Sequence, residues 1–160
     1  MGRQTGRQSQ IRIDMSQLYD IRVALASSII QADIGWGENE VLIKRQTDLW
    51  NDVASAMASA RNGAVLHIGV AEGDSTEDDG LEMNVTVPIT ILCLPQVIQG
   101  ALPEEDLWEA LVKHVHDLRL GSEPFAYRFR FKSFSDLEIE ADGGTGYLGR
   151  QTVFQRKLSL

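Results

Sequence analysis

The sequence predicts an α+β fold in a single domain. We expect a mixed or antiparallel sheet of about four to five strands, with about three helices packed mainly on one face. Three observations lead there: predicted strands outnumber predicted helices, most neighbouring strands are joined by reversals, and there is no internal repeat. A length of 160 residues suits one hydrophobic core, and 43% apolar and 24% charged residues are close to the globular average.

Three segments carry the period of an amphipathic helix. Apolar residues recur at three- and four-residue steps over Ser16–Gln31 and again over Asp48–Arg61, which predicts a helix in each range. The third helix is expected to begin at Pro103 and to be closed by Gly121. Residues 1–12 are polar and predict a flexible arm, so the domain is expected to comprise residues 13–160.

The predicted strands lie between these helices and after them. The clearest alternates apolar and polar residues over Leu81–Leu94, and its Pro88 predicts an edge position or a bulge. It should form a hairpin with Ala64–Ala71, whose tip is the acidic loop Glu72–Gly80. The other expected strands are Val41–Ile43, Tyr127–Phe131 and Tyr147–Leu160.

Three features that could carry chemistry fit structural roles better. Residues 144–149 match G-x-G-x-x-G, but a dinucleotide loop needs a helix after it, and the following residues predict a strand, so we expect a hairpin turn. His114 and His116 diverge on one helix, and His67 stands alone in an apolar strand, which argues against zinc. Cys93 is expected to be a buried thiol. No catalytic residue, metal or cofactor is therefore predicted, and the chain is not expected to be an enzyme.

Composition excludes further classes. Fifteen basic against 23 acidic residues give a net charge of -8, which disfavours broad wrapping of nucleic acid, so no sequence-specific nucleic-acid partner is expected. No apolar run approaches the ~18 residues of a membrane span, so no membrane partner is expected either. The lone Cys93 cannot form an internal disulfide, which favours a cytoplasmic origin.

Two charged groups are candidates for contact between copies of the chain. The simplest interpretation is a solvated basic strand face and a solvated, mobile acidic loop. A sharper hypothesis pairs the basic strand of one copy with the acidic loop of the next. The basic group is Arg128, Arg130 and Lys132, and the acidic group is Asp74, Glu77, Asp78 and Asp79.

The order of elements resembles the tail-terminator (tail-completion) proteins of long-tailed phages and prophages, the minor tail protein U type. The resemblance covers Met15–Leu160. It rests on the opening helix, the hairpin GAVLHIGVAEG…EMNVTVPITILCLP, the amphipathic helix EEDLWEALVKHVHDLRL, and the closing strands YRFRFKSF and YLGRQTVFQRKLSL.

This resemblance implies a non-enzymatic structural protein that forms a ring, expected to be a hexamer, on the last ring of the tail tube. It implies contacts with the tail-tube protein and head–tail connector proteins, and a place in the tail or neck of a virion assembled in the host cytoplasm. The predicted helix Asp48–Arg61 is longer than the family pattern, which leaves another head–tail connector or neck subunit as an alternative. A small cytoplasmic enzyme or ligand-binding domain with an unrecognised site is the alternative of another class.

Overall fold

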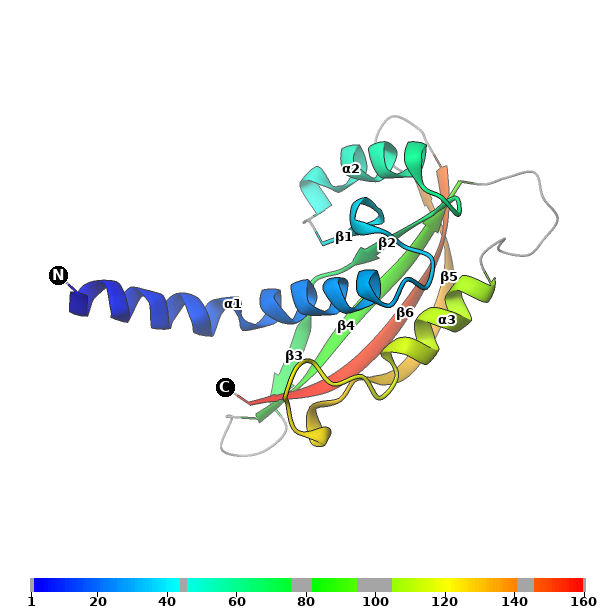
Figure 1. Cartoon of the computed structure of the whole chain (residues 1–160). Coiled ribbons are helices and arrows are strands. Elements are labelled where there is room, and N and C mark those ends of the chain that lie inside the picture. Colours follow the sequence, from blue (N-terminus) through cyan, green and yellow to red (C-terminus); the bar gives the residue numbers. More distant parts are fainter. Residues whose placement is uncertain (1, 44–45, 76–81, 95–104, 141–145, 160) are drawn as a thin grey trace.

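A six-stranded sheet lies at the centre of the computed structural model, which describes residues 2–43, 46–75, 82–94, 105–140 and 146–159 (Figure 1). Its order is β1-β2-β4-β6-β5, with β3 also paired to β4; β1 and β2 are parallel and every other pair is antiparallel. The strands are β1 (Val41–Leu42), β2 (Ala64–Ile68), β3 (Glu72–Ser75), β4 (Glu82–Cys93), β5 (Arg130–Glu140) and β6 (Gly146–Ser159).

Three helices cover the sheet unequally. They are α1 (Gly2–Gln31), α2 (Gln46–Ser59) and α3 (Glu105–Val115), with 3-10 turns η1 (Glu38–Glu40) and η2 (Phe125–Tyr127). α1 and α3 pack on one face, where they share a core with β2, β4 and β6. α2 packs over one end of the other face, against Leu92 and Tyr147. The α+β class with a mixed sheet and three helices is confirmed, and two of the three helices lie on one face.

The main core follows the alternation of the strands. Val85, Val87, Ile89 and Ile91 of β4 are buried under α1 and α3, and Phe154 of β6 lies beside them. The other face of β4 carries polar or smaller side chains as far as Leu92, where α2 begins to cover it. The predicted period of β4 is therefore confirmed, because one face packs on helices and the other is largely uncovered.

Helix α1 ends at Gln31 as predicted but begins at Gly2 rather than near Ser16. The residues expected to form an arm thus continue the helix. Extending an existing helix avoids the cost of nucleation, so a largely polar segment can join it. Figure 1 shows the N-terminal half of α1 extending past the sheet, on the side opposite β5.

Part of the predicted acidic loop is a strand. Glu72–Ser75 forms β3 because β4 is longer than β2, and the remaining length of β4 needs backbone partners. Ile68 faces Ile89 and Glu72 faces Thr86, so the ladder on this side of β4 is interrupted beside Pro88, between β2 and β3. The expectation of an edge position is wrong, because β4 is a central strand, and its pairing with β6 runs through Pro88 without a register shift.

The predicted third helix and the strand after it need correction. α3 ends at Val115, not at Gly121, because the Asp117 N–H donates to the Phe129 carbonyl at 2.8 Å and Phe129 N–H donates to Leu118 at 2.9 Å. Tyr127 belongs to the turn η2 rather than to a strand, and β5 begins at Arg130. These backbone pairs join residues about a dozen positions apart, which local periodicity does not detect.

The G-x-G-x-x-G match has no nucleotide-loop structure in its described part. Residues 146–149 begin β6, which pairs with both β4 and β5. The position following the motif is therefore a strand, as predicted, and no helix N-terminus is available there for a phosphate. Residues 144 and 145 lie outside the described residues.

Arg22 joins α1 to the end of the sheet. This buried arginine donates to the carbonyl oxygens of Ile43, just after β1, and of Ile68, the last residue of β2, the latter at 2.9 Å. The guanidinium thereby serves two carbonyls at the carboxyl ends of neighbouring parallel strands. Helix packing and the short β1–β2 pairing are linked through this one side chain.

Candidate functional site

The predicted basic group already has an acidic neighbour within its own copy. Arg128 donates to Asp117 at 3.0 Å, and its guanidinium lies 3.9 Å from the ring centre of Phe125. Arg130 is 51% exposed and lies 3.8 Å from the same carboxylate. Lys132 is exposed at a bulge in β5. Asp117, which the sequence analysis did not single out, is thus the partner of two of these three bases.

The predicted acidic group is described only in part. Asp74 is exposed on β3 beside Glu72, whereas Glu77, Asp78 and Asp79 lie outside the described residues. β3 and β5 are on opposite sides of β4 and β6, so the structure does not bring Asp74 to the basic group within one copy. Contact between the two groups across copies stays a prediction.

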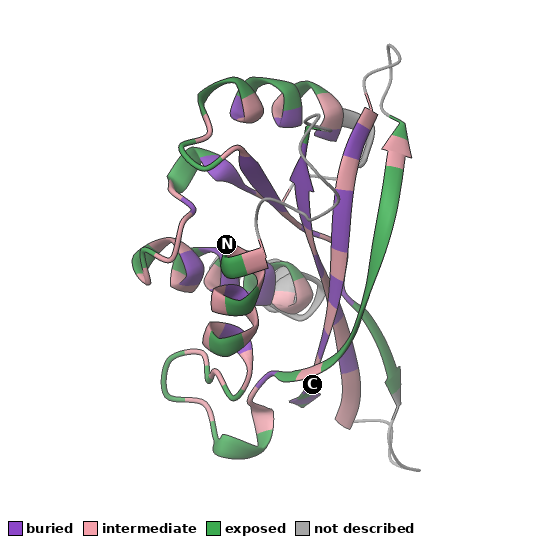
Figure 2. Cartoon of the chain, turned by 90° about the vertical axis from the view of Figure 1, so that its right-hand side faces the viewer, coloured by how far each residue is buried: buried purple, intermediate pink, exposed green. Residues whose placement is uncertain are grey.

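The edge strand β5 is exposed along most of its length (Figure 2). Its start is covered, because His116 bonds to Phe131 of β5, and Asp117 and Leu118 bond to Phe129 just before the strand. No strand pairs with the outer edge beyond that point among the described residues. Phe134 and Leu137 are 48% and 38% exposed there, although they are large and apolar. The second half of β5 is therefore a free, partly apolar strand edge.

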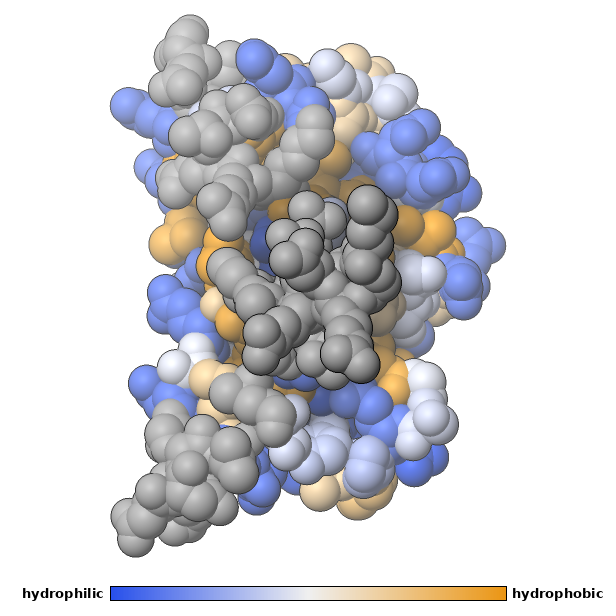
Figure 3. Space-filling view, turned by 90° about the vertical axis from the view of Figure 1, so that its left-hand side faces the viewer, coloured by the Kyte–Doolittle hydropathy of each residue, from blue (hydrophilic) through white to orange (hydrophobic). Residues whose placement is uncertain are grey.

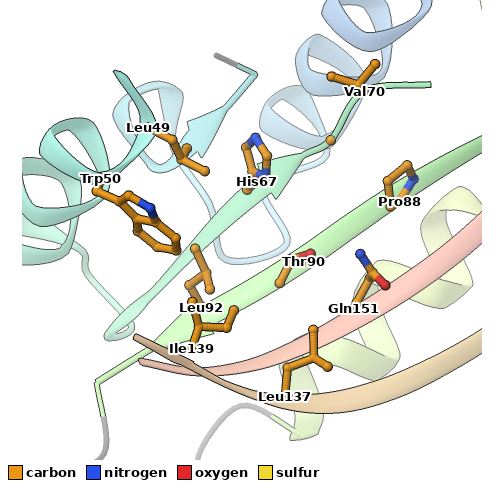
Figure 4. Close-up of a pocket in the computed structure, with 11 residues that line it drawn as sticks. Leu49, Trp50, His67, Val70, Pro88, Thr90, Leu92, Leu137, Ile139 and Gln151 are labelled. Atoms are coloured by element: carbon orange, nitrogen blue, oxygen red, sulfur yellow. The ribbon is translucent and has the colours of Figure 1, made fainter. Parts of the chain in front are cut away.

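A hollow of about 390 Å³ lies on the outer face of the sheet, between α2 and β5 (Figure 4). Leu49 and Trp50 of α2 form one wall, and Leu137 and Ile139 of β5 form the opposite one. Trp50 also stacks on Tyr147, with ring centres 5.8 Å apart. The hollow exists because α2 covers only one end of this face.

Few polar groups line the hollow. His67 of β2, Thr90 of β4 and Gln151 of β6 reach it from three neighbouring strands. Although His67 lies in a mostly apolar strand, it is half-buried at this surface rather than part of the core. The lining residues include no carboxylate or thiol. Most of them are apolar, which suits an apolar or aromatic group.

A second cluster joins α3, β5 and β6 around Arg150. This guanidinium holds Asp136 by two hydrogen bonds of 2.6 and 3.1 Å and Glu105 by one of 2.9 Å. It also lies 4.8 Å from the ring centres of both Trp108 and Phe134. Hydrogen bonding to Arg150 lowers the pKa of Asp136, and hydrogen bonding to Asp136 raises the pKa of Arg150. The cluster is a charged link between the helix and the edge strand.

Arg156 makes a comparable link nearer the C-terminal end of β6. Its side chain is fully buried and donates to both oxygens of Glu123 at 2.7 Å. Its guanidinium lies 5.5 Å from the ring centre of Phe129. Glu123 belongs to the connection between α3 and β5, so the pair fixes that connection against the sheet.

The sequence analysis missed both arginines, although a signal was present. Residues of the same parity share one face of a strand, so Arg150 and Arg156 lie on the same side of β6 as the core residue Phe154. An arginine on the apolar side of a strand predicts a buried ion pair. Its carboxylate partners come from separate elements and could not be named from local sequence.

His114 and His116 contact neighbouring elements through their ring nitrogens. His114 Nε2 lies 2.9 Å from Ser28 Oγ, between α3 and α1, and burial lowers the pKa of His114. His116 Nδ1 accepts from Phe131 N–H at 3.1 Å. Cys93 is buried, as predicted. No group of His, Cys, Asp or Glu suited to a metal ion occurs in the part of the chain that the structure describes.

Neither a comparison with protein-family models nor one with curated proteins gives a match to this chain. Within the described residues, no helix has the length and apolar character needed to cross a membrane. The function is therefore argued from the site itself.

Proposed function

We propose that the chain is a non-enzymatic structural subunit of a phage-like tail: a tail terminator, or tail-completion protein, that forms a ring on the end of the tail tube and offers a surface to the head. Its partners would be other copies of itself, the tail-tube protein and head–tail connector proteins. The element order supports this proposal, since α1, the β3–β4 hairpin, α3 and the β5–β6 hairpin follow one another as the resemblance implies.

The single observation that carries the proposal is the free edge of β5. Unpaired N–H and C=O groups on a long edge strand attract other strands, and proteins that act alone normally shield such edges. Here the edge also exposes Phe134 and Leu137. A subunit whose neighbours cover this edge in an assembly would resolve both features.

Measurement of the native mass tests the proposal. Light scattering over a range of protein concentrations should give a particle several times 17.8 kDa, about six times for a hexamer, and electron microscopy should show rings. Rings added to growing tubes of the cognate tail-tube protein should stop their growth. Rings that bind connector proteins but leave tube growth unchanged would favour another neck subunit, and a monomer at every concentration would overturn the proposal.

The hollow beside Trp50 favours a second candidate, a small ligand-binding domain. Its volume of about 390 Å³ and its apolar walls fit a compact aromatic or aliphatic molecule. Saturable, one-to-one binding of such a compound, followed by tryptophan fluorescence and abolished by Leu137→Arg, would support this candidate if the chain were also monomeric.

A further inference from the structure

The register of the sheet shows which backbone groups on the free edge of β5 are unpaired. On the β2 side of β4, the Pro88 carbonyl accepts from the N–H of Gly69 at 2.8 Å. Neighbouring residues of a strand turn their backbone groups to opposite sides, so the odd-numbered residues of β4 face β6, and the odd-numbered residues of β6 face β5. This alternation leaves the N–H and C=O groups of Phe134, Asp136 and Glu138 directed outward from β5.

Within the described residues, the opposite edge of the sheet is less suited to pairing. It is formed by β1, with two residues, and β3, with four, whereas the free part of β5 comprises residues 132–140. The view from that side shows many hydrophilic residues, with smaller apolar areas between them (Figure 3). β3 carries Glu72 and Asp74, which would meet the carboxylates of β5 with like charge. The two edges of the sheet are therefore poorly matched to one another.

The free edge of β5 is instead complementary to a second copy of itself. If two β5 strands run antiparallel with Ser135 of each copy on a two-fold axis, Lys132 of each copy faces Glu138 of the other. Both side chains are exposed, and neither forms an ion pair with another described residue. In the same register Phe134 faces Asp136, whose carboxylate is already ion-paired within its own copy. The charges on this edge are therefore satisfied by pairing with an identical strand.

Charge and space favour this register over its neighbours. With the axis at Asp136, two identical carboxylates would face each other, and with the axis at Leu137, Asp136 would face Glu138. Moving the axis the other way, to Phe134, would bring the second strand against residues 116–118, which cover the start of β5. An axis at Ser135 avoids both problems.

We propose that two copies of this chain pair through β5, with residues 132–138 of each strand running antiparallel about a two-fold axis at Ser135. The pairing gives partners to the outward backbone groups and covers part of the apolar surface of Phe134 and Leu137. The inference goes beyond the proposed function, since a two-fold contact closes on two copies and cannot continue around a ring. The pair is the form of the free subunit, in which the edge stays covered until ring neighbours replace it.

A disulfide at the axis tests the pairing. The two copies of Ser135 face each other at a non-hydrogen-bonded site, where Cα atoms lie about 4.5 Å apart, within reach of a disulfide. Cys93 is buried and is the sole cysteine, so introduced thiols react without competition. The full chain with Ser135→Cys should therefore form a cross-linked dimer of twice 17.8 kDa on mild oxidation.

Two neighbouring positions provide matched controls. Ser133 faces Leu137 of the other copy in this register, whereas the two copies of Ser133 lie about 13 Å apart along the strands, at about 3.3 Å per residue. Ser133→Cys alone and Leu137→Cys alone should stay largely uncross-linked, and a mixture of the two should give the mixed disulfide. Equal cross-linking of all three single variants would indicate random collision and overturn the proposal.

Charge reversal tests the register independently. Glu138→Lys and Lys132→Glu should each raise the dissociation constant of the dimer about tenfold in sedimentation near 0.1 M salt, because each change acts twice across the axis. An equimolar mixture of the two variants should restore dimers, since every charge then faces its opposite. Glu140→Lys, an equal change just beyond the paired segment, should alter the constant much less. Normal dimers of both single variants would overturn this register.

The outcomes also separate this inference from the proposed function. A free subunit that stays monomeric, with Ser135→Cys cross-linked only after rings form, would assign the edge to ring neighbours; it would overturn the pairing and leave the proposed function standing. Cross-linked dimers, from a chain whose unmodified form never gives rings, would support the pairing and overturn the proposed function. A wild type that is dimeric at low concentration and forms rings at higher concentration would support both. A wild type that is monomeric at every concentration would overturn both.

Discussion

Breaking the Glu123–Arg156 pair from its two sides should cost very different amounts of stability. Arg156 is fully buried, whereas the Glu123 side chain is 33% exposed. Glu123→Ala leaves a buried guanidinium without its carboxylate, and such losses cost about 3–5 kcal/mol. Arg156→Met keeps most of the packed volume and leaves a carboxylate that water can reach, so we expect about 1–2 kcal/mol.

Urea unfolding followed by the fluorescence of the three tryptophans measures both free energies of unfolding at a fixed protein concentration. In thermal melts the glutamate variant should lose about 6–20 °C, at about 2–4 °C per kcal/mol. The double variant should be more stable than Glu123→Ala alone, because it removes the unpaired charge. Arg119→Met, an exposed arginine in the same connection, should change little. An equal or greater loss in Arg156→Met would refute the reasoning.

Three further predictions concern the dependence of stability on pH and the effect of adding a Cβ atom at two glycines. Hydrogen bonding to Arg150 lowers the pKa of Asp136, so the contribution of this pair to the stability of the fold should be lost as the pH falls below about 4. In Asp136→Asn, the free energy of unfolding measured in urea should depend less on pH in that range. Burial lowers the pKa of His114, so as the pH falls the unfolded chain takes up a proton before the folded chain does. The free energy of unfolding should therefore fall as the pH drops below about 6.5, and it should fall less in His114→Gln. Gly35→Ala should lower the melting temperature more than Gly121→Ala. Both glycines have positive φ, but a Cβ added at Gly35 would overlap the Leu107 side chain, whereas no atom lies close to a Cβ added at Gly121. Equal shifts in melting temperature would contradict this prediction.

Elements with a clear local period were predictable from sequence. The end of α1 at Gln31 and the apolar face of β4 depend on neighbouring residues alone. β3 was not predictable in the same way, because Glu72–Ser75 is polar and becomes a strand only through the unpaired length of β4. The early end of α3 likewise depends on Phe129, which binds the chain after the helix.

The candidate surfaces were less predictable than the fold. Basic residues on one strand indicated a contact, but Asp117, which binds Arg128, lies on a separate turn. The hollow depends on how far α2 extends over the outer face, and the Arg150 cluster joins three elements. The direction in which α1 projects, seen in Figure 1, was likewise not predictable from the local period of the helix.

The two hydrogen bonds of Arg22 have a consequence for the order of folding. They join residues 21 and 46 positions apart, whereas β5 and β6 adjoin in sequence. Local hairpins close at a lower entropic cost, so β5–β6 should form before β1 joins the sheet. β1 pairs over only two residues, and Arg22 of α1 binds the carbonyl of Ile43 just after it. Removing the guanidinium should therefore accelerate unfolding far more than it slows folding.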